Sequence, residues 1–247
     1  MYRSADCHVH LSLWEEVSEP FLAMKSAGIL PVGVSCDLED SRRNVHEAQK
    51  LGYPCMIGIH PWYAQSAVFD EAAFSELAQS AQVAGFGECG LDTEGCALAL
   101  SDQQKLLCEE LEFAVSRKLP LNLHVRHAHS ELIKILRSFK GRLCGGCVHN
   151  FTFSKEIARC YLDLGLFLSV GHHVLQQSGR MRQALRYAGI SQILTETDYD
   201  GVHTGSYDQT LIDREINSIA QILDLNPDKT AAALYDNARR FLKKKPS

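Results

Sequence analysis

Short apolar runs alternate with longer amphipathic segments from one end of the chain to the other. Short apolar runs bounded by turn residues are typical of buried strands, whereas the amphipathic segments have the periodicity of helices. The predicted strands are Ala5–Leu11, Ile29–Cys36, Pro54–His60, Ala84–Asp92, Leu119–Val125, Gly146–Phe151, Leu166–Gly171 and Ile193–Asp198. Eight strand–helix repeats predict an α/β protein with one domain, residues 1–247, folded as a (β/α)₈ TIM barrel. A doubly wound open sheet is the alternative, but its first turn is usually rich in glycine, and here that turn carries histidines.

Capping residues mark the start of three predicted helices. Residues 101–104 (Ser-Asp-Gln-Gln) resemble a capping box that opens a helix running to about Lys118. Ser154 can cap a helix that ends near Gly165. Asn226, which is followed by a proline, places both a cap and a first-turn proline at the start of the last helix.

Polar residues share one face of several predicted strands, close to the carboxyl ends. Asp6, His8 and His10 alternate in the first strand, and His124 and Arg126 alternate in the fifth. Alternate residues of a strand point to the same side, so these side chains would face the barrel interior. Burying unpaired polar groups is costly, and metal ions at the carboxyl end of the barrel would compensate for it.

Histidines and carboxylates at the strand ends are candidate metal ligands. His8 and His10 are two residues apart, which places them roughly 6.6 Å apart along one face of an extended strand. Imidazoles and carboxylates without thiolates suit Zn²⁺, Mn²⁺, Fe²⁺ or Mg²⁺. The full candidate set falls at the ends of five strands and consists of His8, His10, Glu88, His124, His149 and Asp198.

We expect this set to hold two divalent ions, Zn²⁺, Mn²⁺ or Mg²⁺. His8, His10 and Asp198 would bind one ion, His124 and His149 would bind the other, and Glu88 would bridge the two. Two ions ~3.5–4 Å apart activate a water between them and stabilise both the attacking and the leaving oxygen. Asp198 and Glu88 are therefore the predicted catalytic residues, with Asp198 taking or relaying the proton of that water.

The charge of the predicted site favours a phosphate-bearing substrate. Neutral histidines, two carboxylates and two divalent ions sum to about +2. Three further acids, Asp6, Asp92 and Glu196, are predicted to orient the ligands rather than to bind metal. Small neighbours of Glu88, the glycines at positions 87 and 90, would let a ligand approach it.

Four residues near the predicted mouth could contact substrate. His60 ends the third strand and is interpreted as a contact to a substrate phosphate, with a structural role as the alternative. Arg126 could reach an anionic substrate, or it could form a surface ion pair. Trp62 and Tyr63 could stack on a base, or they could pack within their own loop.

The composition limits the classes of partner. A net charge of −5 disfavours binding to nucleic acid over a broad basic face, so we expect DNA to bind only transiently, at the active site. No apolar run approaches membrane-spanning length, and no signal peptide is evident. Nine cysteines, several of them inside apolar runs, indicate reduced thiols in a cytoplasmic protein, which we expect to be a monomer.

Seven short motifs occur in the order in which a known family carries them. They are Asp6-x-His8-x-His10, Gly58-Ile59-His60-Pro61, Gly87-Glu88-x-Gly90-Leu91-Asp92, His124-x-Arg126-x-Ala128, His149-x-Phe151, Glu196-Thr197-Asp198 and Asn237-Ala238-x-x-x-Phe241. As a set they resemble the TatD-like metal-dependent hydrolases, also called TatD deoxyribonucleases. The resemblance implies an amidohydrolase-type barrel with two divalent metals that hydrolyses phosphodiesters, typically DNA. The metal positions that it implies coincide with the set of six residues above.

The chain departs from the family pattern in loops that would hold substrate. Residues 199–201 (Tyr-Asp-Gly) replace the usual small residue and proline, and Asn150 replaces a common cysteine. Residues 93–95 (Thr-Glu-Gly) stand where an aromatic residue is frequent. The leading hypothesis is a deoxyribonuclease acting from the 3′ end. The alternatives are a hydrolase of another ester or amide, such as an aminoacyl-tRNA bond, and a non-catalytic subunit of a complex.

Overall fold

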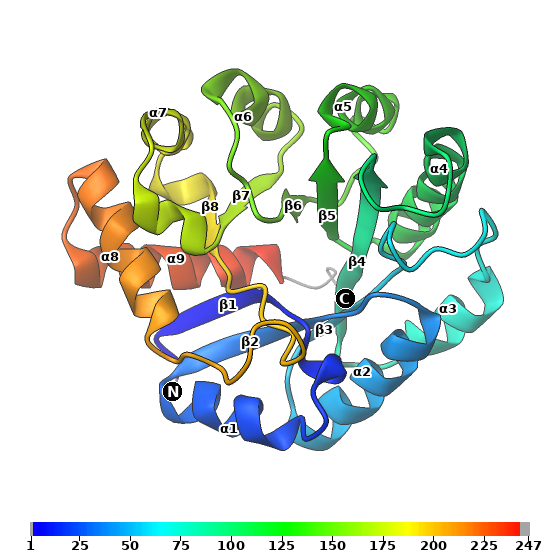
Figure 1. Ribbon diagram of the computed structural model, residues 1–247, viewed down its shortest axis with the longest axis horizontal. Helices are drawn as coiled ribbons and strands as arrows, with labels where there is room; N and C mark the ends of the chain where they lie inside the picture. Colours follow the sequence, from blue (N-terminus) through cyan, green and yellow to red (C-terminus); the bar gives the residue numbers. More distant parts are fainter. Residues whose placement is uncertain (1, 243–247) are drawn as a thin grey trace.

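The computed structural model describes residues 2–242, in which eight parallel strands form one sheet in sequence order (Figure 1). The strands are β1 (Ser4–Val9), β2 (Ile29–Val34), β3 (Cys55–Ile57), β4 (Val83–Asp92), β5 (Leu121–Arg126), β6 (Gly146–Val148), β7 (Phe167–Val170) and β8 (Ile193–Thr195). The sheet curls until β8 meets β1, where the Thr195 hydroxyl donates to Ala5 O at 2.8 Å and Asp198 N donates to His8 O at 2.9 Å. The predicted TIM barrel is therefore confirmed.

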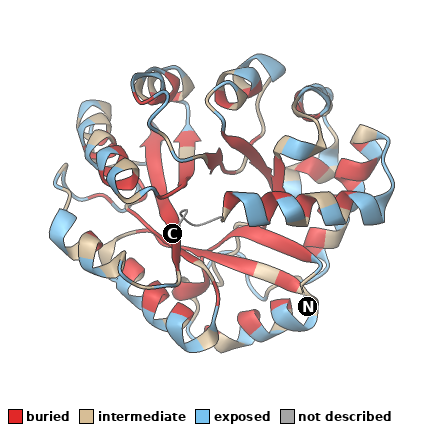
Figure 2. Cartoon of the chain, turned by 180° about the vertical axis from the view of Figure 1, so that it is seen from behind, coloured by how far each residue is buried: buried red, intermediate tan, exposed pale blue. Residues whose placement is uncertain are grey.

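Helices surround the strands and connect each to the next (Figure 1). They are α1 (Ser18–Ser26), α2 (Leu38–Leu51), α3 (Glu71–Leu77), α4 (Leu100–Arg117), α5 (His129–Ser138), α6 (Lys155–Leu162), α7 (Gly179–Ala188), α8 (Leu211–Leu223) and α9 (Pro227–Phe241). Short 3₁₀ turns follow β1, β7 and α7, at Leu11–Leu13, His172–Gln176 and Ile190–Gln192. The strands and the inner faces of the helices are buried, while the outer helix faces are exposed (Figure 2).

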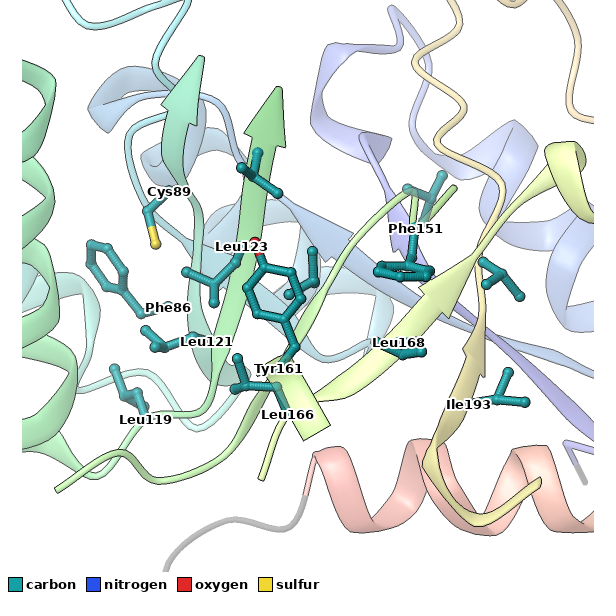
Figure 3. Packing of buried hydrophobic residues seen from close by; sticks show 14 of the residues in the cluster. Phe86, Cys89, Leu119, Leu121, Leu123, Phe151, Tyr161, Leu166, Leu168 and Ile193 are labelled. Carbon is teal, nitrogen blue, oxygen red and sulfur yellow. The ribbon is translucent and has the colours of Figure 1, made fainter. Parts of the chain in front are cut away.

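Two apolar clusters fill the molecule. The larger lies between the strands and the helices and includes Leu121, Leu123 and Tyr161 (Figure 3). The smaller lies inside the barrel, and α9 extends it with Phe241, whose ring packs edge-on against Phe167 at 6.4 Å. Because α9 packs against the starting ends of the strands, the opposite, carboxyl end is the one left open to a polar site.

Six of the eight strands end earlier than the apolar runs predicted, while β4 ends at Asp92 as predicted and β5 ends one residue later, at Arg126. β8 stops at Thr195, not at Asp198, and β6 stops at Val148. Asp198 has a φ of 60°, so the backbone leaves the extended conformation at the point where this side chain turns inward. The residues that follow β6 and β8 therefore do not pair in the sheet, and Asp198 among them turns its side chain inward.

The inward face of β1 also differs from the prediction. Cys7, not Asp6, packs in the cluster inside the barrel, and the register of β1 against β2 shifts between Asp6 and Val9. This irregularity lets His8 turn inward, where its ring contacts Asn122. The prediction that Asp6 shares the face of His8 and His10 is wrong because simple alternation does not hold across such a shift.

One helix boundary was predicted wrongly and one correctly. α4 begins at Leu100, and Ser101 lies inside the helix without capping it. Gln103 contacts the end of β4 instead. Its Oε1 accepts from Asp92 N at 2.9 Å, and its Nε2 donates to Asp92 O at 2.8 Å. The Asn226 cap is confirmed, since its side chain accepts from Lys229 N.

Two glycines of β4 permit its close contact with β5 beside Glu88. A Cβ at Gly87 would lie 2.5 Å from Asn122 O, and one at Gly90 would lie 1.9 Å from His124 O. Both glycines also have φ near 150°, a region that other residues rarely adopt. These glycines therefore allow the close packing of β4 against β5.

No disulfide joins any of the nine cysteines, all of which lie in the part of the chain that the structure describes. This agrees with the prediction of reduced thiols. Within residues 2–242, no helix combines the length and the apolar character needed to cross a membrane.

Candidate metal centre

The predicted ligands converge on the floor of a cavity of about 830 Å³ at the carboxyl end of the barrel. Three of them lie in strands: Glu88 in β4, His124 in β5, and His8 in β1, below the cavity floor. The other three, His10, His149 and Asp198, directly follow β1, β6 and β8 or lie within three residues of them. The set that the sequence placed at strand ends is thus brought together by the barrel geometry.

His8, His10 and Asp198 form the first group of facing donor atoms. The Nε2 atoms of His8 and His10 lie 3.1 Å apart. Asp198 Oδ1 lies 3.5 Å from His8 Nε2 and 3.4 Å from His10 Nε2. These donor atoms are close enough together to share one ion.

His124, His149 and Glu88 form the second group. Glu88 Oε1 lies 2.9 Å from both His124 Nδ1 and His149 Nε2, and those two nitrogens are 3.2 Å apart. The other oxygen of Glu88, Oε2, lies 3.2 Å from His8 Nε2 and 3.5 Å from His10 Nε2. One carboxylate therefore faces both groups, which is the arrangement a bridging ligand requires.

The tautomers of His8 and His10 follow from their outer partners. His8 Nδ1 lies 3.0 Å from Asn122 Oδ1, and His10 Nδ1 lies 3.0 Å from Val34 O. Asn122 is itself oriented because its amide nitrogen donates to Cys7 O at 3.4 Å. Both partners are acceptors, so each Nδ1 carries the proton and each Nε2 presents a lone pair to the cluster.

Carboxylates lie behind the rings of His124 and His149. His124 Nε2 lies 2.8 Å from Asp92 Oδ2, so Nδ1 of that ring faces the cluster unprotonated. His149 Nδ1 lies 3.5 Å from Glu196 Oε1, an ion-pair distance rather than a hydrogen bond. Glu196 is held in turn by Asn150 N and the Ser169 hydroxyl. Asp92 and Glu196 thus lie behind His124 and His149, on the side of each ring that faces away from the cluster.

The converging lone pairs make the cluster suited to a cation. Burial opposes ionisation of Glu88, yet the imidazoles of His149, His60 and His8 hold its pKa well below the usual range. Burial alone would lower the pKa of His149, but Glu88 and then Glu196 raise it well above its usual value. The cluster offers four imidazole nitrogens and two negatively charged carboxylates as donors. This donor set fits divalent ions such as Zn²⁺ or Mn²⁺.

His60 lies beside the same cluster but presents a proton to it. Its Nδ1 accepts from Trp62 N at 3.0 Å, so the proton is on Nε2, which lies 3.4 Å from Glu88 Oε1. Burial lowers the pKa of His60 to about 3, so the ring is neutral. His60 lies close enough to Glu88 and His124 to share an ion with them, but with its proton on Nε2 it acts as a hydrogen-bond donor at the cavity floor.

Asp6 supports the segment that carries Asp198 rather than a histidine ring. Its carboxylate accepts from Thr197 N at 2.9 Å, from the Tyr207 hydroxyl at 3.2 Å and from His8 N at 3.3 Å. Burial raises the pKa of Asp6 to about 7. The orienting role predicted for Asp6 is thus directed at the backbone on either side of the first group.

Charged side chains at the rim of the cavity pair with one another. Arg126 forms an ion pair with Glu94, and His127 Nε2 lies 2.9 Å from the other oxygen of Glu94. All three side chains are about half exposed. Of the two interpretations of Arg126, the ion pair is the one seen in this structure.

Sequence reasoning missed several supporting residues. Asn122 orients His8 through a contact across the barrel, which the spacing along the chain does not reveal. Glu94, two residues after Asp92, lies in one of the loops that depart from the family pattern, and this was its signal in the sequence. Ser169, which bonds to Glu196 from the neighbouring strand, carries no signal in the sequence.

Comparison with known proteins gives a consistent result. The family model described as TatD related DNase matches residues 5–243. The chain is 29% identical over 203 residues to the uncharacterized metal-dependent hydrolase YcfH of Escherichia coli (strain K12), covering 80% of this chain and 76% of that protein. It is 29% identical over 170 residues to the 3′-5′ ssDNA/RNA exonuclease TatD of Citrobacter koseri, covering 63% and 64%. The crystal structure of YJJV, a TatD homolog from Escherichia coli K12, shares the fold with a TM-score of 0.82 at 24% identity, covering 95% and 96% of the two chains.

Proposed function

Because this chain belongs to the TatD related DNase family, we propose that it is a metal-dependent phosphodiesterase that degrades DNA from the 3′ end. The observation that carries the proposal is the orientation of the cluster. Each of its four histidines has one nitrogen turned to an oxygen acceptor outside the cluster and the other turned inward. Such an arrangement is typical of histidines that bind a metal ion.

Two divalent ions, Zn²⁺, Mn²⁺ or Mg²⁺, fit this donor set. His8, His10 and Asp198 would hold one ion, and His124 and His149 would hold the other, with Glu88 shared between them. When bound, such ions supply an activated water and neutralise charge that develops on a phosphate.

The protein's own groups have distinct tasks in this reaction. Burial would raise the pKa of Asp198, but its contact with His10 and the nearby imidazoles of His149 and His8 lower it. The carboxylate is therefore ionised and can take a proton from the attacking water. The side chain of Asp198 is one-third exposed to the cavity, so water reaches it. His60 Nε2–H can donate to a phosphate oxygen beside Glu88. Arg126 can exchange Glu94 for a second phosphate of the same strand.

The composition of the rim favours a second candidate. Glu94 neutralises Arg126, and Asp200 also lines the cavity, so the rim is less cationic than a phosphate-binding surface usually is. An ester or amide, such as an aminoacyl-tRNA bond, would be compatible with this rim. A non-catalytic role within a complex would not require a complete and oriented ligand set.

A nuclease assay separates these possibilities. Single- and double-stranded DNA labelled at the 5′ end is incubated with the purified protein and Mg²⁺, Mn²⁺ or Zn²⁺. We expect stepwise shortening from the 3′ end, which EDTA and the variant Asp198→Asn abolish. Intact DNA, together with cleavage of a chromogenic carboxylic ester or of aminoacyl-tRNA, would show that the second candidate is correct.

A further inference from the structure

Trp62 stands at the wall of the cavity with its aromatic face exposed. It follows β3, and its side chain is part of the cavity lining with 48% of the residue accessible to solvent. Its ring centroid lies 5.2 Å from that of His60 and 6.1 Å from that of His124, both at steep interplanar angles. The indole is therefore adjacent to the cluster without covering it.

Hydrogen bonds fix the indole in this position. Its Nε1–H donates to Asp92 Oδ2 at 2.8 Å and to Glu94 O at 3.1 Å, and its backbone N–H donates to His60. The other tryptophan, Trp14, shows the opposite arrangement, because its ring packs against Gly201 while its buried N–H has no hydrogen-bond partner among the residues that the structure describes. Trp62 is held by its polar edge, and its apolar face is left free for a ligand.

Asp92 links this indole to the metal centre. The same oxygen, Oδ2, receives the N–H of Trp62 and the Nε2–H of His124, each at 2.8 Å. A group that fixes the indole therefore also fixes the carboxylate that orients His124. Asp92 Oδ2 therefore connects the position of the Trp62 indole at the rim to the orientation of the His124 ring at the floor.

We propose that Trp62 stacks on the 3′-terminal nucleobase of the substrate and acts, through Asp92, as a positioning residue for His124. The proposal rests on the nuclease function proposed above and adds the group that recognises the strand end. A flat, pre-oriented aromatic face accepts any base and costs little entropy when it stacks. A base on Trp62 places its own phosphate next to the cluster, because indole and His124 are neighbours.

Two oligothymidylates test the stacking role on the unaltered protein. One has a normal 3′-terminal nucleotide, and the other has a terminal nucleotide without a base. We expect the base to lower KM by about tenfold, which is within the range of single stacking contacts. In Trp62→Leu this preference should disappear, whereas Tyr187→Ala, a matched change of an exposed aromatic residue on α7, should keep it. Equal KM values for the two substrates with the unaltered protein would overturn the stacking role.

Trp62→Phe tests the positioning role separately. Phenylalanine keeps an aromatic face but has no N–H for Asp92, so the base preference should remain while kcat and the affinity for Mn²⁺ each fall several-fold. Unchanged kcat and Mn²⁺ affinity in this variant would overturn the positioning role. Mn²⁺ affinity is measured by titration without substrate, so this readout does not depend on activity.

Binding distinguishes failure of this proposal from failure of the proposed function. Fluorescence anisotropy of the two labelled oligonucleotides is measured with the Asp198→Asn variant and with the same variant carrying Trp62→Leu. Tighter binding of the strand with its terminal base, lost in the double variant, supports stacking even if no DNA is cleaved. Equal binding of both strands by Asp198→Asn overturns stacking even if the unaltered protein proves to be a nuclease.

Discussion

At the floor of the cavity three of the four candidate ligand histidines, His8, His10 and His124, are held from behind by one defined acceptor. At the rim, charged side chains pair with each other in solvent. His10 is buried and tied to Val34 O, while Arg126 and Glu94 are about half exposed and tied only to their neighbours. Groups that are buried and fixed are suited to hold ions and reacting atoms in one geometry. Groups that are exposed and exchangeable are suited to select and release substrate, because surface ion pairs contribute little free energy.

The largest effect is expected at the floor. Asp198→Asn removes the proton acceptor of the first group, and we expect kcat to fall by about 10³-fold or more. Asp102→Asn, an exposed aspartate on α4, is the control and should leave kcat unchanged. Initial rates on labelled DNA measure both variants. A loss of less than tenfold in Asp198→Asn would show that the floor is not the reacting centre.

Loss of an orienting carboxylate should have an intermediate effect. In Asp92→Asn the amide can turn its NH₂ group towards His124, so the tautomer of that ring is no longer fixed. We expect the affinity for Mn²⁺ to fall by about 10–100-fold, measured by calorimetric titration. Glu94→Gln, two residues further along the same loop, should leave that affinity unchanged. If both variants bound Mn²⁺ equally well, the distinction between floor and rim would fail at this point.

Buried carboxyls with and without imidazole neighbours show opposite pKa shifts. Glu88 and Glu215 are both buried, but both oxygens of Glu215 lack a hydrogen-bond partner among residues 2–242. Burial, and then the charges of Asp6 and Glu196, raise the pKa of Glu215 well above its usual value. Burial raises the pKa of both carboxyls, and at Glu88 the surrounding imidazoles reverse the shift.

The raised pKa of Glu215 predicts the sign of a stability change with pH. Its folded-state pKa is the higher one, so its stabilising protonation is complete below its unfolded pKa and is lost as pH rises towards the folded pKa. We expect Glu215→Gln to raise Tm relative to the unaltered protein by about 2–4 °C more near pH 8 than near pH 5, measured by calorimetry. The same Tm difference at both pH values would contradict a raised pKa.

The smallest effect is expected at the rim. Glu94→Gln frees Arg126 from its ion pair, and we expect KM for DNA to fall about two- to fivefold at low salt, with kcat unchanged. The gain should shrink as ionic strength rises and should vanish when Arg126→Ala is combined with it. A higher KM in Glu94→Gln would mean that Glu94 orients Arg126 for the substrate instead of competing for it.

The barrel and the six candidate ligands could be predicted because both depend on local pattern. Alternation and strand length mark the strands, and a parallel barrel brings their carboxyl ends together whatever the details of packing. The partners behind the ligands could not be predicted in the same way. Asn122 and Val34 meet His8 and His10 across strands, and a carbonyl acceptor leaves no mark in the sequence.

Errors in the prediction occur where tertiary contacts override local preference. Ser101 has the sequence of a cap, but Gln103 bonds to the backbone of Asp92 and the helix begins one residue earlier than Ser101. Asp6 fits the alternation of β1, but the register shift turns it towards Thr197. The ion pairs at the rim could not be predicted, because Glu94 meets Arg126 and His127 only where the segment after β4 lies beside the end of β5.

Crystals grown with Mn²⁺ and inorganic phosphate, measured at the manganese absorption edge, test the central claim most directly. We expect two anomalous peaks about 3.5–4 Å apart, bridged by Glu88. One peak should contact His8 Nε2, His10 Nε2 and Asp198, and the other should contact His124 Nδ1 and His149 Nε2. A single peak, or an ion bound to His60 Nε2 in place of these nitrogens, would contradict the central claim.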